Sequence, residues 1–245
     1  MKNTKILVLG DGLLGSSLAS QTDWDILSRK KDGFDITDTS TYHLMTKVEH
    51  GTIQYCPYDI IVNTIACTDT YSKDRDEHWS VNYEAVSKLV DFCNSWKIKL
   101  VHIVTDYIYA NSVPGITEEG VPVHCGNWYG YTKLLGDAHV QLKSEDYLLI
   151  RSTHKPEPFT YEKAWVNQIG NFDYVSEISK LMTKLIETEA SGIYNLGTEV
   201  KTMYELAKRT KPEVQPEFKL LDASTPDNLV MDTSKLYNTL KGESS

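Results

Sequence analysis

The chain has 245 residues, enough for one large domain or for a domain with a small additional lobe. Its composition, 40% hydrophobic and 24% charged, is that of an ordinary globular protein, and no apolar run approaches the roughly 20 residues that span a bilayer. A net charge of −9 argues against nucleic acid or an anionic membrane as a partner. No export signal is visible at the N-terminus, so we expect a cytoplasmic protein.

Short apolar segments alternate with amphipathic ones along the chain. Strands are predicted at 5–9, 25–28, 59–63, 100–105, 146–151 and 192–196, and helices at 13–20, 78–96, 129–143, 174–188 and 203–210. In the second of these helices, Val86, Leu89, Val90 and Cys93 follow the spacing i, i+3, i+4, i+7. Because the strands lack polar alternation and are separated by helices, we expect an α/β fold with a doubly wound parallel sheet covered on both faces.

Two segments, 153–173 and 211–232, interrupt this alternation. The first contains two prolines and is rich in aromatic residues, and the second contains three prolines. In open α/β sheets, ligands bind beyond the carboxyl ends of the strands, and each segment follows a strand-and-helix unit. We therefore predict that residues 1–152 form a dinucleotide-binding domain with the catalytic residues. Residues 153–245 would add a strand to the sheet and form a small substrate lobe.

The cysteines and histidines indicate neither a metal site nor a disulfide framework. Cys56, Cys67, Cys93 and Cys125 include no C-x-x-C pair, and no histidine pairs with a cysteine at ligand spacing. His102 lies in an apolar, strand-like run, so we expect it in the core or at an edge of the sheet. The expectation is reduced thiols and no bound metal.

A glycine-rich turn follows the first predicted strand and opens the first predicted helix. It reads G-D-G-L-L-G, with Gly10, Gly12 and Gly15 around Leu13 and Leu14. In this context the G-x-G-x-x-G pattern predicts a dinucleotide site, since the glycines allow a tight turn and close approach of the pyrophosphate to the helix N-terminus. A glycine turn without a ligand is the alternative.

Cations follow the second predicted strand, where NAD-binding folds place an acid. Ser28, Arg29, Lys30 and Lys31 occupy this position, which favours a 2′-phosphate and so NADPH over NADH; a solvated loop tip would also explain them. A little further on, Asp35 and Ile36 would flank an adenine with a carboxylate and an apolar side chain.

The stretch N-W-Y-G-Y-T-K, residues 127–133, suggests half of an acid–base site. Tyr129 and Lys133 are four residues apart and share a helix face, whereas Tyr131 points away from the lysine. A nearby ammonium lowers the pKa of a phenol. Thr105 ends the fourth predicted strand, where its hydroxyl would face the nicotinamide end of a dinucleotide. The three side chains together could bind a carbonyl and give it a proton.

The chain resembles the extended short-chain dehydrogenases/reductases, and among them the dTDP-4-dehydrorhamnose reductases. The matching stretches, spread over residues 6–236, are ILVLGDGLLG, FDITD, DIIVNTIACT, VHIVTDYIY, WYGYTKLLGD, GIYNLG and LVMDTSKL. The resemblance implies a Rossmann fold and the catalytic triad Thr105, Tyr129 and Lys133. It also implies a cofactor site made by the glycine loop, the Arg29 region, Asp35, Ile36, and the loop with Thr64, Ile65 and Ala66. The implied reaction is NADPH-dependent reduction of the 4-keto group of a nucleotide-linked 6-deoxyhexose, as in dTDP-rhamnose biosynthesis, with NADH as the alternative cofactor and a homodimer as the assembly.

Other readings keep the same fold. Dehydratases follow the strand-end threonine with Asp-Glu, whereas Asp106 and Tyr107 follow Thr105 here, which favours reduction. An epimerase or bifunctional epimerase–reductase would use the same triad. A non-catalytic NADP-binding regulatory subunit would fit a substrate segment after Arg151 that is shorter than in the family. Thr225-Pro226 stands where the family has Arg-Pro.

Overall fold

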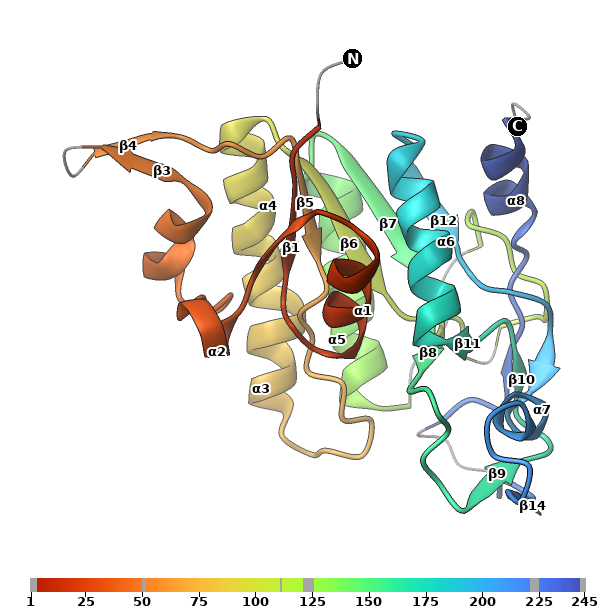
Figure 1. Ribbon diagram of the computed structural model, residues 1–245. Coiled ribbons are helices and arrows are strands. Elements are labelled where there is room, and N and C mark those ends of the chain that lie inside the picture. The colour runs from red at the N-terminus through yellow and green to blue at the C-terminus, as the bar shows by residue number, and fades with distance from the viewer. Residues whose placement is uncertain (1–3, 50–51, 111, 121–125, 221–224, 243–245) are drawn as a thin grey trace.

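The computed structural model describes residues 4–49, 52–110, 112–120, 126–220 and 225–242. Its centre is a six-stranded sheet in the order β12-β7-β6-β5-β1-β2 (Figure 1). The strands are β1 (Ile6–Leu9), β2 (Asp25–Leu27), β5 (Ile60–Asn63), β6 (Lys99–Val104), β7 (Tyr147–Arg151) and β12 (Gly192–Asn195). Every pairing among them is parallel. The predicted doubly wound parallel sheet is confirmed.

Alternate residues of the strands pack on opposite faces of the sheet, as the period of two requires. On β1, Leu7 and Leu9 belong to the core under one set of helices, and Ile6 and Val8 to the core under the other. The first set is α4 (Ala85–Trp96), which α3 (Arg75–Trp79) precedes, and α5 (Trp128–Lys143). The second set is α1 (Leu13–Gln21), α6 (Val175–Glu187) and α8 (Ser234–Lys241). Both faces are therefore buried, which explains why the strands lack polar alternation.

The helix predicted over 78–96 begins earlier and has an irregular centre. Helix α3 runs into a π-helical turn, η2 (Ser80–Glu84), which continues into α4. The predicted stripe Val86, Leu89, Val90 and Cys93 is fully buried against the sheet. Each such side chain contributes about 1.5–3 kcal/mol on burial, so this stripe holds the helix in place.

Several elements at the β2 end of the sheet were not predicted. A short helix α2 (Arg29–Asp32) and a 3-10 segment η1 (Thr39–Met45) follow β2. The strands β3 (Lys47–Glu49) and β4 (Thr52–Tyr55) then pair antiparallel and project from the molecule at the left of Figure 1. This hairpin lies outside the main sheet.

The two irregular segments come together in a small lobe at the lower right of Figure 1. Strand β9 (Lys163–Trp165) pairs with β14 (Gln215–Glu217), and β10 (Ile169–Gly170) lies between β13 (Lys201–Thr202) and β15 (Asn228–Leu229). The pair β8 (His154–Lys155) and β11 (Asp173–Tyr174) joins the lobe to the main sheet, and α7 (Met203–Lys208) covers it. The lobe has its own apolar core around Phe172 and Leu206.

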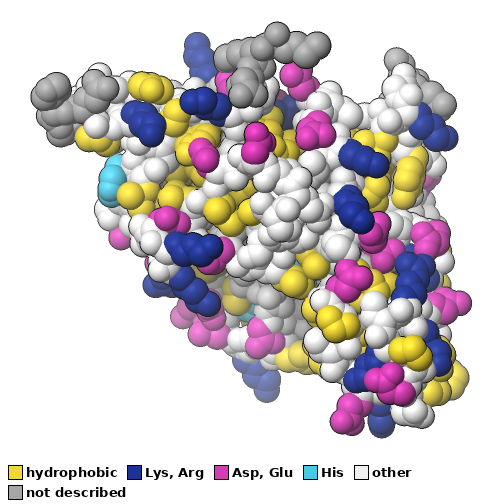
Figure 2. Space-filling view, viewed as in Figure 1, with side chains coloured by type: hydrophobic (Ala, Val, Ile, Leu, Met, Phe, Trp, Pro, Cys, Tyr) yellow, Lys and Arg dark blue, Asp and Glu magenta, His cyan; other side chains and the backbone are white. Residues whose placement is uncertain are grey.

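Charged side chains of both signs are interspersed over the face shown in Figure 2. Among the described residues, no helix combines the length and the apolar character needed to cross a bilayer. Cys56, Cys67 and Cys93 carry free thiols, and Cys125 lies outside the described residues. Within the same described ranges, no three histidine, cysteine or acidic side chains are grouped as a metal site requires.

Candidate active site

The glycine turn between β1 and α1 is built by close backbone packing. Gly10 has a φ of +99°, a conformation that side-chain-bearing residues rarely adopt, and a Cβ there would lie 2.8 Å from Ile65 Cγ1. A Cβ on Gly15 would lie 1.9 Å from the Gly10 carbonyl oxygen. Gly12, by contrast, is exposed, has nothing within 4 Å of a Cβ, and begins α1 without a side-chain cap. The turn thus leaves the first amides of α1 open for an anion, as a pyrophosphate requires.

The loop after β5 completes the floor of this turn. Thr64 donates its hydroxyl to the Leu9 carbonyl at 2.7 Å, and Ile65 packs on the core beside Gly10. Ala66 faces a cleft of about 380 Å³. The cleft is lined by the glycine turn, this loop, the end of β6 and helix α5. The lining residues include Gly12, Leu13, Leu14, Thr64, Ala66, Thr105, Tyr129 and Lys133. The three residues predicted for catalysis therefore share one cleft with Gly12, Leu13 and Leu14 of the predicted cofactor turn.

The residues predicted to bind the adenosine end of the cofactor differ in how far they are exposed to solvent. Arg29 is exposed and pairs with Asp35 at 3.0 Å, and Lys30 is also exposed. Ser28 is buried and caps α2 by accepting from the Lys31 amide at 3.3 Å. The hydroxyl of Ser28 therefore has a structural partner, whereas the cations after it are exposed, with Arg29 in a surface ion pair.

The Ile36 side chain, predicted to flank an adenine, is buried in this structure. Ile36 is only 3% exposed and belongs to the core cluster beneath α4. Its apolar side chain gains more by burial against the core than it could at the surface, so only its backbone can face a ligand. Asp35, next to it, stays half-exposed and accepts from the amide and hydroxyl of Thr37.

Helix α5 positions the tyrosine and the lysine. Its N-cap Asn127 accepts from the Gly130 amide at 2.7 Å, which fixes the first turn. Tyr129 lies in that turn and Lys133 one turn later, so both reach the cleft from one helix face. Thr105 enters from the end of β6. The three predicted catalytic side chains come together, although their roles remain predictions.

The pKa of the phenol differs from the expectation. Burial raises the pKa of Tyr129 to about 12, Asp106 and Cys67 add to the rise, and the Thr105 hydroxyl opposes it. Lys133 does not lower it here: its ammonium donates to the Ile103 carbonyl at 2.6 Å, and burial lowers its own pKa to about 8. Desolvation therefore outweighs the ion–phenol attraction, and the phenol is protonated at neutral pH.

A second cleft, of about 650 Å³, continues from the first into the lobe. The two share Thr68, Thr70, Tyr107 and Lys155 in their linings. The lobe part is bordered by the aromatic side chains Tyr71, Tyr107, Phe159, Tyr161 and Trp165. An elongated ligand could therefore have one end at Tyr129 and the other among aromatic rings.

Asn82 is a positioning residue that the sequence analysis missed. It lies in the π-helical turn η2, where its side chain exchanges hydrogen bonds of 2.9 Å with the backbone N–H and C=O of Cys67. It also donates to the Thr132 hydroxyl at 3.1 Å. It thus ties the loop after β5 to helix α5. Single π-turns in long helices are frequent at functional sites, but they leave no mark in hydrophobic periodicity.

Asp106 entered the sequence comparison only because it follows Thr105, in a pattern that favours a reductase over a dehydratase. The structure shows that it also contacts the candidate active site. It is fully buried directly after Thr105, and its Oδ1 accepts from the hydroxyls of Thr105 and Thr153. Its Oδ2 has no partner among the described residues. Burial raises its pKa to about 6, and Lys155 is among the groups that oppose the rise.

Comparisons with known proteins agree with this geometry. The family model described as RmlD substrate binding domain matches residues 4–154. The spore coat polysaccharide biosynthesis protein SpsK of Bacillus subtilis (strain 168) is 27% identical over 248 aligned residues, covering 91% of this chain and 84% of that protein. A dTDP-4-dehydrorhamnose reductase of Mycolicibacterium smegmatis is 26% identical over 188 residues, covering 72% of this chain and 50% of that protein. The solved structure of dTDP-4-dehydrorhamnose reductase from Bacillus anthracis in complex with NADP superposes with a TM-score of 0.80 at 22% identity, covering 96% of this chain and 92% of that one.

Proposed function

Since the chain belongs to the RmlD substrate binding domain family, we propose that it is an NADPH-dependent oxidoreductase. Its substrate would be a nucleotide-linked 4-keto-6-deoxyhexose, and its reaction the reduction of the 4-keto group. The observation that carries the proposal is that the open glycine turn and the side chains Thr105, Tyr129 and Lys133 line one cleft. The names of the relatives agree with this chemistry, since two of them are dTDP-4-dehydrorhamnose reductases.

The glycine turn fits the cofactor. Gly10 and Gly15 leave no room for side chains, and Gly12 leaves open space above the N-terminus of α1. A helix N-terminus stabilises negative charge, so the free amides there would hold the pyrophosphate. Arg29 and Lys30, in the first turn of α2 after β2, would favour a 2′-phosphate. When bound, the nicotinamide supplies the hydride.

The triad then acts as a carbonyl-binding and proton-donating group. The Thr105 hydroxyl would donate a hydrogen bond to the keto oxygen and orient it in the cleft. The raised pKa of Tyr129 keeps its phenol protonated, as a proton donor for reduction requires. As negative charge develops on the keto oxygen, Tyr129 would pass it a proton. In this structure the ammonium of Lys133 donates to the Ile103 carbonyl, so it would turn toward Tyr129 to stabilise the phenolate left behind.

The remaining expectations form part of the same proposal. Residues 1–152 would hold the cofactor and the triad, and residues 153–245 would supply β12 and the substrate lobe. The aromatic border of the lobe cleft would receive the nucleoside, since nucleobases stack on such rings. We also propose that the protein acts in the cytoplasm and as a homodimer, which sedimentation velocity would test.

The test is oxidation of NADPH, followed at 340 nm, with dTDP- and UDP-4-keto-6-deoxyglucose supplied together with a 3,5-epimerase. Tyr129→Phe should lower kcat by about 100-fold or more, the usual contribution of a general acid. Tyr131→Phe is the matched control on the opposite helix face and should be unchanged. Tight NADPH binding without turnover by the wild type would refute the reductase and favour a regulatory subunit.

A further inference from the structure

Lys155 lies at the junction of the two parts of the cleft. It is the last residue of β8, four residues after the carboxyl end of β7. Its side chain is half-buried and lines both the part that contains Thr105 and Tyr129 and the part bordered by Phe159 and Trp165. A ligand that extends from the triad into the lobe must pass it.

Other buried cations of the described chain have partners. Arg151 pairs with Asp137 at 2.9 Å, Lys201 with Asp173 at 3.1 Å and Lys219 with Asp227 at 2.6 Å. Lys133 has the Ile103 carbonyl. These pairings offset the cost of removing a charge from water.

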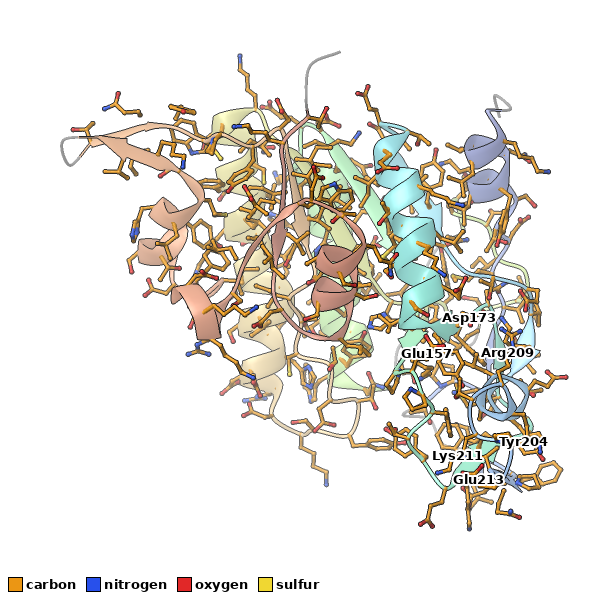
Figure 3. All side chains as sticks on the ribbon, viewed as in Figure 1. Glu157, Asp173, Tyr204, Arg209, Lys211 and Glu213 are labelled. Carbon is orange, nitrogen blue, oxygen red and sulfur yellow. The ribbon has the colours of Figure 1, made fainter. Side chains whose placement is uncertain are left out.

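Charged side chains of the lobe that lie outside the cleft also have partners. Figure 3 labels several of its charged residues, among them Glu157, Asp173 and Arg209. Arg209 bridges Asp173 at 3.3 Å and Glu199 at 2.6 Å. Glu157, two residues after Lys155, accepts from the Ser176 hydroxyl. None of these contacts involves Lys155.

Among the described residues, Lys155 makes no hydrogen bond and has no carboxylate within ion-pairing distance. Burial lowers its pKa, and only the more distant Asp106 opposes this shift. Asp106 is engaged by the hydroxyls of Thr105 and Thr153. On the outer wall of the lobe cleft, Lys163 is paired with Glu217 at 2.9 Å, and Glu162 is exposed. An oxyanion at the junction would give the Lys155 ammonium the partner that the protein does not supply.

The order of groups along the cleft matches the order of groups in a sugar nucleotide. The triad, Lys155 and the aromatic border follow one another, as the sugar, the diphosphate and the nucleoside do. We propose that Lys155 binds the diphosphate of a nucleotide-linked sugar whose keto group lies at Tyr129, an assignment that rests on the proposed function. Lys155 would then select substrates with a diphosphate between sugar and base.

Binding of stable sugar nucleotides tests the assignment without turnover. Calorimetry with the NADP⁺-loaded protein would compare dTDP-glucose, UDP-glucose and thymidine. Lys155→Met should weaken binding of the sugar nucleotide roughly 10- to 100-fold, as loss of a charged hydrogen bond does, and leave thymidine unaffected. Lys155→Arg should keep most of the affinity. Lys163→Met is the matched control, because Lys163 lines the same cleft but is exposed and already paired.

Several results would overturn the assignment. Equal affinity of wild type and Lys155→Met for the sugar nucleotide, or no binding of either sugar nucleotide by the wild type, would do so. Weaker NADP⁺ binding in Lys155→Met would assign the lysine to the cofactor. UDP-glucuronate serves as a further ligand: a loss of affinity for it alone, with UDP-glucose unchanged, would assign Lys155 to a sugar carboxylate. Lys155-dependent binding without NADPH oxidation would refute the reductase alone and leave the diphosphate site standing.

Discussion

Replacing Gly12 with aspartate should separate cofactor binding from stability. Gly12 is the N-cap of α1, its φ of −67° suits any residue, and a Cβ there meets nothing within 4 Å. Aspartate is among the best N-cap residues and exceeds glycine by a few tenths of a kcal/mol. A carboxylate also interacts favourably with the helix dipole, by about 0.3–1 kcal/mol. The free energy of unfolding of Gly12→Asp should therefore equal or slightly exceed that of the wild type.

The same carboxylate should repel the pyrophosphate of the cofactor. Two like charges about 4 Å apart repel by about 4 kcal/mol at the effective dielectric constant of a protein surface. This energy corresponds to a loss of NADPH affinity of about 1000-fold. Gly12→Asn is the neutral control of the same shape, so the difference between the two variants isolates the charge.

Fluorescence titration with NADPH and thermal unfolding without cofactor would measure the two effects. Unchanged NADPH affinity in Gly12→Asp would show that the pyrophosphate does not approach the N-terminus of α1. A large loss of stability would contradict the open space around Gly12. Gly15→Ala offers the contrast, since its Cβ would lie 1.9 Å from a backbone oxygen and the turn itself must move.

Two further predictions concern charge. Arg29→Ala should weaken NADPH binding roughly tenfold and leave NADH unchanged, because Arg29 is 80% exposed and would meet only a 2′-phosphate; equal effects on both cofactors would contradict this role. Asp106 has a pKa near 6 in the folded protein against about 3.8 when unfolded, so its contribution to stability is present at low pH and is lost as the pH rises through 6. Asp106→Asn has no carboxyl to ionise, so its free energy of unfolding should not fall in this way. The difference in free energy of unfolding between Asp106→Asn and the wild type should therefore shift in favour of the variant by up to about 3 kcal/mol between pH 4 and pH 7 in urea unfolding. A difference independent of pH would refute the burial argument.

The sequence patterns predicted those helices and strands whose apolar side chains recur at regular spacing and are buried on one face. Helix α4 shows this, since Val86 and Leu89 are completely buried on one face. The hairpin of β3 and β4 escaped prediction because its apolar residues Val48 and Ile53 are 46% and 48% exposed and form no core pattern. Helix α8 buries only Leu236, which is too little for a period to appear.

The candidate site was predictable where spacing alone decides the geometry. The glycine turn and the interval from Tyr129 to Lys133 are of this kind. The direction of the pKa shift of Tyr129 could not be predicted, because it depends on how deeply the folded chain buries the phenol. Lys155 lies in a segment without periodicity, and nothing in the sequence distinguishes an unpartnered lysine from a solvated one.

The sheet is completed by a strand that the ribosome makes late. Strand β12 pairs with β7, yet the lobe segment separates them in sequence, and helix α6 covers the face to which Val8 belongs. A nascent chain that ends near residue 152 would expose β7 as an open edge and lack this cover. At usual synthesis rates, roughly 5–20 residues per second, this state lasts several seconds. Truncated products should therefore aggregate, and native folding should begin only once β12 has left the exit tunnel.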